Sequence, residues 1–439
     1  MFRYVKLHNY KSLIDFNVNL MSTRKKPKKM ILVYGENGVG KSNFATAFYT
    51  LSELLKTKSV KELWDVIRKK ENKDKDDVSF QKFLRDNFCD TETIIKKCKT
   101  INSKDNMILE FGFNYKGYNG VYYLETNNTR IVAERLEYVL NKNLTTLFDI
   151  SDNQQPKINS NIFKIPRYED EILDLIEKYW GKHSLLSILT YEIEDKAEGY
   201  VKKRIAKNLF DIILFFNRLS LRVKEGNRVE RSKIRNSHQI FNDLDTGEIP
   251  ISNETELDKT ENLLNEFFTH LYSDIKQVYY KKEIKDDKLN YNLFLKKMVY
   301  NQLIDVDFSM ESTGTQCLLE IIPYLIDAVE GNTVIIDELD TGIHDLLIET
   351  ILENLYNSVK GQIIITTHNT MFLETDLAKD CVYIFKLDKD ANKELVPLTS
   401  FEERIHPNLN IRKRYLKGMY GGIPLAMDID FNDLLENME

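Results

Sequence analysis

The sequence predicts an α/β protein in which the two ends of the chain form one parallel-sheet core around an inserted middle region. A nearly continuous apolar run, Met30–Gly35, ends in a glycine-rich turn and is followed by a helical pattern. Beyond residue 312, apolar runs that begin at Thr333, Gln362 and Asp380 alternate with helical patterns. Strands of a parallel sheet are buried on both faces and read as continuous apolar runs, and strand–helix alternation is typical of such a sheet.

The composition indicates an ordered protein with enough apolar sequence for one large or two medium-sized cores. Of the 439 residues, 42% are hydrophobic, and tyrosine and phenylalanine occur 23 times each. Glycine (17) and proline (8) are scarce, which argues against low-complexity linkers. The formal net charge of −6 gives no global attraction for nucleic acid, but it leaves room for local basic patches.

The cysteines and the apolar segments indicate where the protein works. The four cysteines form no C-x-x-C pair, so we expect reduced thiols and no zinc site, with Cys317 buried in a helix. The N-terminus lacks the apolar segment of a signal peptide, and no stretch reaches the roughly 18 apolar residues of a membrane span. We therefore expect a soluble, cytoplasmic protein with no membrane partner.

Sequence patterns divide the chain into five segments. Two strands, over 2–10 and 16–20, precede the apolar run at 30–35, and a helix follows over 42–55. No internal repeat and no long heptad array occurs, so we expect no long coiled-coil arm. The predicted segments are 1–55, the first half of the core; 56–104, a charged helical segment; 105–140, an antiparallel β-subdomain; 141–304, a mostly helical insertion with a polar loop at 224–257; and 305–439, the second half of the core.

The turn after the first core strand fits the phosphate-binding pattern G-x-x-x-x-G-K-[ST] in full. Backbone N–H groups of such a turn surround phosphate oxygens, while Lys41 reaches the β- and γ-phosphates and the Ser42 hydroxyl binds Mg²⁺. An ordinary glycine turn that caps a helix is the alternative, but the strand before the motif and the helix after it favour a nucleotide site. The predicted nucleotide-binding residues are Gly35, Glu36, Asn37, Gly38, Val39, Gly40, Lys41, Ser42 and Asn43.

Two adjacent carboxylates end the apolar run that begins at Thr333. We expect Asp337 to hold Mg²⁺ and Glu338 to orient or deprotonate an attacking water. The alternative is a helix start whose acidic residues favour the helix dipole. The phosphate loop in the same chain favours metal binding and catalysis.

The next apolar run ends in His368. Open parallel sheets bind their ligands at the carboxyl ends of the strands, so His368 is predicted to sense the γ-phosphate or hold the attacking water. A histidine at the surface or in the core, without such a role, is the alternative.

A small polar turn, Ser312-Thr313-Gly314-Thr315, opens the apolar helical run before these strands. A plain helix N-cap explains it locally, although open N–H groups at a helix start can also bind phosphate. The order of phosphate loop, small-residue turn, Asp-Glu pair and histidine resembles that of ATP-binding-cassette (ABC) ATPases. In that class a Ser-Gly-Gly-Gln signature turn contacts the γ-phosphate bound by the other subunit. The resemblance assigns this role to Ser312 and Gly314, whereas Thr313 and Thr315 depart from the common form.

Further motifs narrow the resemblance within this class. "LHNYKSL" (Leu7–Leu13) is similar to the opening of the chromosome-maintenance (SMC), recombination-repair (RecF) and OLD-type ATPases. "DELDTGIH" (Asp337–His344) is similar to their D-loop, with Asp340 at the nucleotide and His344 in place. The tail "KRYLKGMYGGIP" (Lys413–Pro424) resembles the ending of bacterial abortive-infection ATPases from phage-defence operons. The resemblance covers residues 1–55, 105–140 and 305–425.

The resemblance implies an ABC-type ATPase head that uses ATP and Mg²⁺ as a molecular switch. Two copies of the chain would sandwich ATP, each supplying the phosphate loop, Asp337, Glu338 and His368 to one site and its signature turn to the other. It further implies a role in anti-phage defence, in which the switch senses infection and controls a separate toxin or nuclease. Gln81 is a candidate for the Q-loop.

Three other functions fit parts of the pattern. A DNA-repair or DNA-maintenance ATPase would use the same head, and a slowly hydrolysing scaffold would bind a partner protein while locked by nucleotide. A transporter subunit is disfavoured by the opening motif and by the insertion. Asp428 and Asp430 do not indicate a nuclease, because only nine residues follow Asp430, too few for a Toprim domain, and a solvated acidic tail explains them.

Two basic stretches could contact DNA phosphates, but they could equally be solvated surface or contact an acidic protein. They comprise Arg222, Lys224, Arg228, Arg231, Lys233 and Arg235 in the middle region, and Arg412, Lys413 and Arg414 near the C-terminus.

Overall fold

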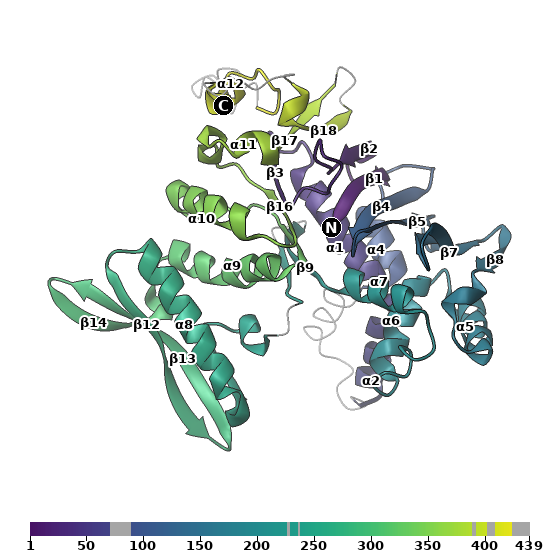
Figure 1. Cartoon of the computed structure of the whole chain (residues 1–439), viewed down its shortest axis with the longest axis horizontal. Coiled ribbons are helices and arrows are strands. Elements are labelled where there is room, and N and C mark those ends of the chain that lie inside the picture. The colour runs from purple at the N-terminus through teal and green to yellow at the C-terminus, as the bar shows by residue number, and fades with distance from the viewer. Residues whose placement is uncertain (71–88, 226–228, 236–237, 389–391, 402–408, 424–439) are drawn as a thin grey trace, which may run out of the picture.

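A seven-stranded sheet joins the two ends of the chain, as the sequence predicts (Figure 1). The computed structural model describes residues 1–70, 89–225, 229–235, 238–388, 392–401 and 409–423. The sheet has the order β10 (Val229–Lys233), β9 (Leu219–Glu225), β15 (Thr333–Ile336), β16 (Gln362–Thr366), β3 (Met30–Tyr34), β17 (Val382–Leu387) and β18 (Lys393–Pro397). The five inner strands are parallel, and β10 and β18 are antiparallel edges.

Alternating side chains of the inner strands divide the apolar interior into two cores. Ile31 and Val33 of β3 face one core, while Leu32 and Tyr34 face the other. The first core includes α1 (Lys41–Leu54), and the second includes α9 (Thr313–Glu330) and α10 (Asp345–Ser358). Because both faces of the sheet are covered, β3, β15, β16 and most of β17 are continuously apolar, which is why the sequence revealed them.

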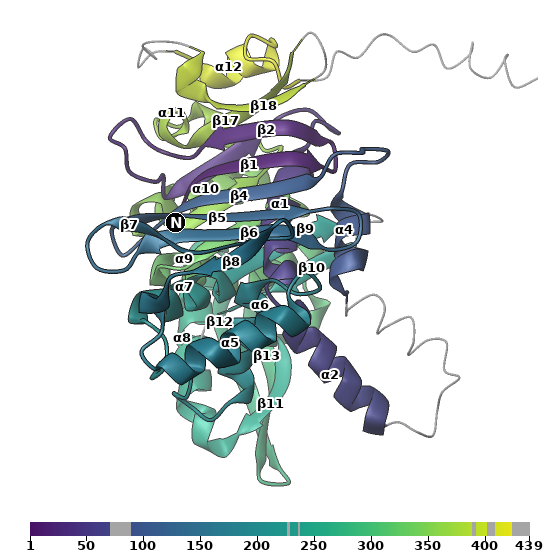
Figure 2. The ribbon, with the colours of Figure 1, turned by 90° about the vertical axis from the view of Figure 1, so that its right-hand side faces the viewer.

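A second, antiparallel sheet packs over the first core (Figure 2). Its order is β2 (Leu13–Asn19), β1 (Phe2–Tyr10), β4 (Met107–Tyr115), β5 (Tyr118–Thr126), β6 (Ile131–Val139), β7 (Leu144–Ser151) and β8 (Gln154–Ile158). The predicted subdomain over 105–140 is thus three strands of a larger sheet that begins at the N-terminus. The accompanying helices are α2 (Thr57–Lys70), α4 (Thr91–Cys98), α5 (Pro166–Tyr179), α6 (Leu185–Asp195) and α7 (Lys207–Asn217).

The prediction of a mostly helical insertion over 141–304 is wrong for much of that segment. Strands β7 and β8 extend the antiparallel sheet, and a third sheet contains β11 (Thr246–Pro250), β12 (Ile275–Lys285), β13 (Lys288–Val299) and β14 (Gln302–Asp307). Helices α5, α6 and α7 and helix α8 (Glu254–Leu271) keep the predicted helical form in this segment, and α8 packs on β12. In β13, buried and exposed positions alternate, so the apolar residues follow a period of two rather than 3.6.

The predicted helix through residue 223 ends early for a tertiary reason. Helix α7 stops at Asn217, and the following "LSLRV" becomes β9, which pairs in parallel with β15. Local propensity does not reveal such a pairing, because its partner lies more than a hundred residues later in the chain. The predicted polar loop at 224–257 likewise contains β10 and β11.

The remaining described segments are two short helices and several 3-10 turns distributed along the chain. They are α11 (Ala378–Cys381), α12 (Ile411–Leu416) and the short 3-10 turns Ser160–Ile162, Gln239–Asn242, Ile251–Asn253, Phe308–Met310, Met371–Glu374 and Leu398–Ser400. Cys317 is half-buried rather than fully buried as predicted. None of the helices in the described part of the chain is long and apolar enough to cross a membrane. Gln81, Arg228, Pro424, Asp428 and Asp430 lie outside the described residues.

Candidate active site

The phosphate loop connects β3 to α1 at the carboxyl end of a central strand. Gly38 (φ 80°) and Gly40 (φ 121°) adopt backbone conformations that side chains disfavour. Gly40 is the N-cap of α1 and has no side chain to cap the helix. The first N–H groups of α1 therefore face the loop, as a phosphate site requires.

Lys41 lies across this loop. Its ammonium donates to the carbonyl oxygen of Gly35 at 2.8 Å and to that of the next residue at 2.9 Å. Burial lowers the pKa of Lys41, and the carboxylates of Asp337, Glu338 and Asp340 act in the opposite direction. The ammonium is thus within electrostatic reach of all three acidic residues, although they follow a different strand.

Asp337 follows β15 and is buried. Its Oδ1 accepts a hydrogen bond of 2.5 Å from the Thr366 hydroxyl, which in turn accepts the backbone N–H of Glu338 at 2.8 Å. Its Oδ2 is buried and forms no hydrogen bond within the described residues. Burial raises the pKa of Asp337, whereas the hydroxyls of Thr366 and Ser42 act against that shift.

These residues fit a Mg²⁺ ion. A buried carboxylate oxygen without a protein partner is costly, and a hard cation that prefers oxygen ligands satisfies it. The described residues contain no group of three or more His, Cys, Asp or Glu side chains able to hold a metal alone, so substrate phosphates would complete the coordination. Ser42 and Asp337 would hold the ion, which when bound would neutralise charge on the β- and γ-phosphates.

Glu338 adopts a left-handed backbone conformation with φ of 52°. Its Oε2 accepts a hydrogen bond from the Lys224 ammonium of β9, and the Thr341 hydroxyl lies 3.5 Å from the same oxygen. Burial raises the pKa of Glu338, but Lys224, with smaller contributions from His368 and Lys41, outweighs burial and places the pKa below its ordinary value. The side chain is therefore ionised at neutral pH, as a general base must be.

His368 follows β16, the strand between β15 and β3. Its backbone N–H donates to a carboxylate oxygen of Asp340 at 3.1 Å. Burial and Lys41 lower the pKa of His368, opposed by Asp340, Glu338 and Asp337, so the imidazole is largely neutral at pH 7. Strands β15, β16 and β3 are adjacent in the sheet. Their carboxyl ends thus bring together the predicted groups from three separate sequence motifs.

The predicted signature turn is not part of this cluster. Ser312 is the N-cap of α9: its hydroxyl accepts the Thr315 N–H at 3.3 Å and lies 2.9 Å from the Thr315 hydroxyl. Helix α9 packs against β9 and β15, whereas the phosphate loop follows β3 beyond β16. Within the described residues, no hydrogen bond joins this turn to the phosphate loop.

The signature turn instead packs on residues 340–344, the second part of the D-loop motif; the name D-loop is used below for these residues. A Cβ on Gly314 would lie 2.7 Å from the carbonyl oxygen of Gly342. His344, matched by the resemblance, caps α10 through the N–H of Leu346 at 3.2 Å. The turn and the D-loop are therefore in close contact within one chain.

Ser12 of the opening motif is hydrogen-bonded to the segment that contains the phosphate loop, directly and through Lys393. The Ser12 hydroxyl accepts hydrogen bonds from Asn43 at 2.6 Å and Lys393 at 2.7 Å, and Lys393 also donates to the Gly38 carbonyl at 3.2 Å. Asn43, a predicted nucleotide-binding residue, is thus bonded to a protein hydroxyl. The other predicted loop residues are Glu36, Asn37 and the buried Val39.

The tail motif also packs against the phosphate loop. The Tyr415 ring meets the Tyr34 ring edge-on, with centroids 5.8 Å apart. A Cβ on Gly422 would lie 3.4 Å from the Gly35 Cα and 2.9 Å from the Phe385 carbonyl oxygen. The C-terminal segment therefore supports the strand that leads into the loop.

Sequence reasoning missed Thr366 and Lys393, and it placed Lys224 only in a basic stretch and not at the candidate active site. Thr366 carried one signal, since it lies two residues before His368 at the end of the same predicted strand. Lys224 and Lys393 carried none, because 114 residues separate Lys224 from Glu338 and 381 separate Lys393 from Ser12.

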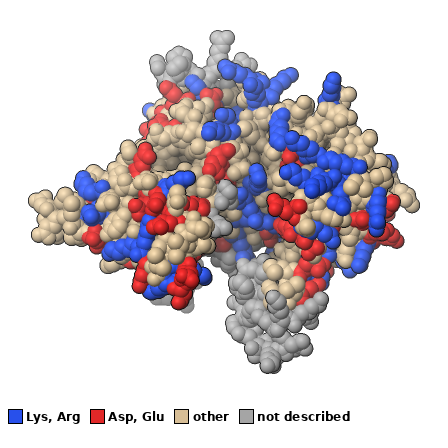
Figure 3. Space-filling model, turned by 60° about the horizontal axis from the view of Figure 1, so that its bottom comes forward, with Lys and Arg blue, Asp and Glu red and all other residues tan. Residues whose placement is uncertain are grey.

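At least three of the six basic residues of the predicted stretch over 222–235 form ion pairs within the fold. Arg222 pairs with Glu230 and Glu320, Lys224 with Glu338, and Lys233 with Glu53. Near the C-terminus, Arg412 pairs with Glu374 at 3.1 Å. Both signs of charge occur across the face shown in Figure 3. These ion pairs reduce the positive charge that the stretch over 222–235 offers to nucleic-acid phosphates.

The fold and the site define a nucleotide-binding protein of the P-loop ATPase class, with an ABC-type α/β core and an antiparallel β-subdomain. A family model described as "AAA domain, putative AbiEii toxin, Type IV TA system" matches residues 30–374. This range is well over half of the chain and contains the phosphate loop, Ser312, Asp337 and His368. The chain belongs to this family.

Solved structures that match this chain include SMC heads and RecF. An SMC head bound to the C-winged helix domain of ScpA is 12% identical over 91% of this chain and 99% of its own, with a TM-score of 0.44. The SMC head domain from Thermotoga maritima is 13% identical over 90% and 98%, with a TM-score of 0.36. The recombination mediator RecF-ATPrS of the RecFOR pathway is 12% identical over 91% and 98%, with a TM-score of 0.38. No curated protein matches the sequence.

Proposed function

We propose that this protein binds and hydrolyses ATP and that two copies of the chain form the complete catalytic site. The observation that carries the proposal is the Thr366 hydroxyl, which bonds both Asp337 and the backbone of Glu338 and so fixes a metal ligand beside a general base. Lys41 lies within electrostatic reach of both carboxylates, where it would contact the β- and γ-phosphates.

In this mechanism the loop N–H groups and Lys41 hold the phosphates in line for attack. Glu338 accepts a proton from a water molecule whose oxygen bonds to the γ-phosphorus, and the bond to the bridging oxygen breaks to release ADP. Neutral His368, whose backbone is tied to Asp340, would orient the water or donate to a γ-phosphate oxygen.

The second copy would supply the signature turn. Ser312 and Gly314 lie outside the cluster of their own chain, yet they open a helix whose first N–H groups can bind an anion. ATP would thus close a dimer and hydrolysis would open it, a two-state switch biased by γ-phosphate contacts. The contact of Gly314 with Gly342 supports communication between the two halves.

We further propose that this switch acts in the cytoplasm in bacterial anti-phage defence and controls a separate toxin or nuclease. The family description, "putative AbiEii toxin, Type IV TA system", supports a link to such a system. The abortive-infection-like tail supports it as well, because the tail packs against Gly35 and could report the state of the phosphate loop to a partner.

The central test is Glu338→Gln, which preserves shape and removes the base. We expect ATP turnover to fall by about 100-fold or more, while ATP binding persists and the dimer accumulates. Phosphate release measures the first effect, and light scattering on a sizing column with ATP measures the second. Normal turnover in this variant would remove Glu338 from the mechanism.

A capture experiment tests the effector. Tagged wild-type protein and the Lys41→Ala variant are compared in cells that carry the neighbouring genes. Lys29→Ala is the control, because Lys29 precedes β3, at the end of that strand away from the phosphate loop, and donates to the Val359 carbonyl. We expect one partner whose recovery depends on Lys41 and not on Lys29. If no such partner is captured and DNA strongly stimulates ATP hydrolysis, the DNA-maintenance alternative is favoured. If a partner is captured but ATP turnover is very slow, the nucleotide-locked scaffold is favoured.

A further inference from the structure

Lys224 links the catalytic carboxylate to the D-loop. Its ammonium donates to Glu338 Oε2 and to the Thr341 hydroxyl at 3.1 Å. The Lys224 and Glu338 side chains are 28% and 34% exposed, so the pair is partly shielded from water. Charge-assisted hydrogen bonds of this kind are stronger than neutral ones.

Strand register places Lys224 beside Glu338. Strand β9 pairs with β15 so that Arg222 lies opposite Ile336, and the Asp337 N–H continues the ladder by donating to the Arg222 carbonyl at 2.8 Å. The position two residues beyond Arg222 therefore lies level with Glu338, which is two residues beyond Ile336. The contact thus follows from the sheet itself.

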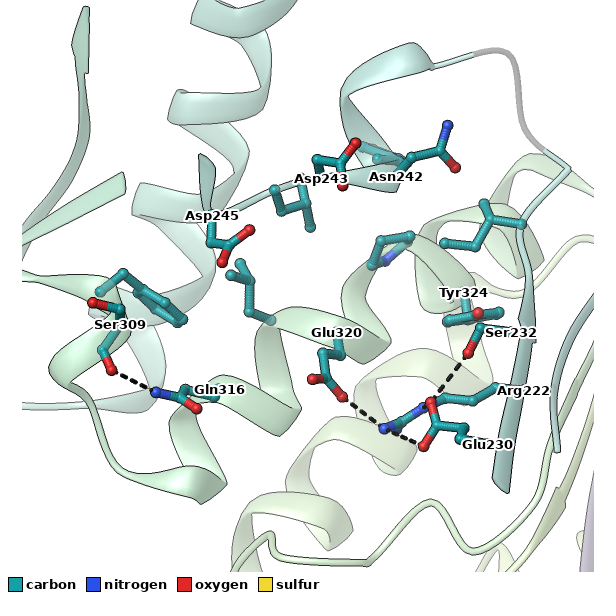
Figure 4. A pocket seen from close by; sticks show the side chains of 16 residues that line it. Arg222, Glu230, Ser232, Asn242, Asp243, Asp245, Ser309, Gln316, Glu320 and Tyr324 are labelled. Carbon is teal, nitrogen blue, oxygen red and sulfur yellow. Dashed lines mark hydrogen bonds and ion pairs between the residues drawn. The ribbon is translucent and has the colours of Figure 1, made fainter. Parts of the chain in front are cut away.

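The same face of β9 also contacts the signature helix. Side chains alternate along a strand, so Arg222 and Lys224 share a face. The Arg222 guanidinium binds Glu230 at 2.8 and 3.1 Å and Glu320 of α9 at 2.7 Å, beside a cavity of about 530 Å³ (Figure 4). One strand face therefore joins the helix that starts at Ser312 to the carboxylate that would activate water.

The contact is unfavourable for water activation. A general base must offer a carboxylate lone pair to the water, and the Lys224 ammonium occupies one lone pair of the Glu338 carboxylate. The left-handed backbone of Glu338 is itself costly for a residue with a side chain, so surrounding contacts must hold it.

We propose that Lys224 is a positioning residue that holds Glu338 away from water in the separate chain and releases it when the D-loop moves on dimer closure. The D-loop can transmit this change because Thr341 shares the ammonium while Gly342 contacts Gly314 of the signature turn. A signature turn engaged by the partner's nucleotide would displace Gly342, remove Thr341 from Lys224 and free Glu338. This inference rests on the proposed ATPase function.

The test is Lys224→Met, assayed for phosphate release over a wide range of protein concentrations. At low concentration, where chains are separate, we expect turnover per chain to rise about tenfold, since a general base contributes about 10²–10⁴-fold when fully available. At high concentration the variant and the wild type should converge, because closure has already freed Glu338. Lys224→Gln should behave like Lys224→Met, and it keeps the test valid if the methionine variant misfolds. Lys224→Arg should resemble the wild type.

Lys288→Met is the matched control, because it removes an exposed lysine–glutamate pair with Glu248 far along the chain. Its turnover should equal that of the wild type at every concentration. Equal or lower turnover of Lys224→Met at low concentration, with an active wild type, would overturn the role of Lys224 alone. No hydrolysis by the wild type at any concentration would overturn the proposed ATPase function and this inference with it.

Discussion

The phosphate loop and the signature turn are both small-residue turns that open a helix, but their surroundings differ. At the phosphate loop, the N-cap Gly40 has no side chain, and Lys41 is within electrostatic reach of three carboxylates from the segment that follows β15. At the signature turn, Ser312 caps its own helix and contacts Thr315, while Gly314 packs on the D-loop. Local sequence makes both turns competent for phosphate, but only the first is surrounded by catalytic groups from its own chain.

This difference supports the proposed divided site. No hydrogen bond within the described residues joins the turn to its own phosphate loop, so the turn would serve catalysis if another copy brought a nucleotide to it. If the turn were merely a helix cap, its chemistry would matter for stability and not for turnover. The predictions below separate these two roles.

The largest effect is expected at Ser312. Ser312→Arg should leave ATP binding intact and lower turnover by about 100-fold, as expected when an anion-stabilising contact is lost. Fluorescent-nucleotide binding and phosphate release measure the two properties. Met310→Arg, which adds the same side chain at a highly exposed position two residues earlier, should remain active.

A second substitution at this position separates the role of Ser312 as a helix N-cap from its proposed role in phosphate binding. Ser312→Asp keeps an excellent N-cap, whose loss would cost about 1 kcal/mol, but it places a negative charge where phosphate would bind. Turnover should fall as in Ser312→Arg while the melting temperature stays near that of the wild type. A fully active Ser312→Asp would show that the turn is only a helix cap.

A smaller effect is expected where the signature turn meets the D-loop. In Gly314→Ala, the added Cβ would lie 2.7 Å from the Gly342 carbonyl, so the D-loop must shift. We expect turnover to fall by about tenfold, because small displacements of catalytic groups are costly, with ATP affinity unchanged. Thr313→Ala removes atoms at the neighbouring position and should be nearly neutral, and an active Gly314→Ala would break the proposed coupling.

The smallest effect is expected where the tail supports the phosphate loop. Gly422→Ala adds a Cβ 2.9 Å from the Phe385 carbonyl and 3.4 Å from the Gly35 Cα. We expect ATP affinity to weaken by about threefold, a change of roughly 0.7 kcal/mol, measured by calorimetric titration. Gly117→Ala is the control, since it has a similar positive φ of 85° but nothing within 4 Å of the added atom. Equal affinities of the two variants would mean that the tail does not affect the loop.

Sequence reasoning succeeded where burial or motif chemistry is local. The inner strands β3, β15, β16 and β17 were predicted because both of their faces are covered, and the phosphate loop was predicted because its glycines and Lys41 follow a fixed spacing. It failed over 141–304, where β9 and β13 become strands through their partners. Amphipathic runs with mixed composition fit either a helix or a strand, and only pairing decides between them.

The sequence by itself determined the class of chemistry: a phosphate loop, a carboxylate pair and a histidine, each at the end of a buried run. Tertiary structure decided which of these groups meet, because the order β15, β16, β3 brings three distant motifs to one edge and leaves the signature turn outside. It also placed Lys224 on Glu338 through a register between strands more than a hundred residues apart. The physical reason is that motif spacing is a property of consecutive residues, whereas electrostatic partners are chosen by strand pairing.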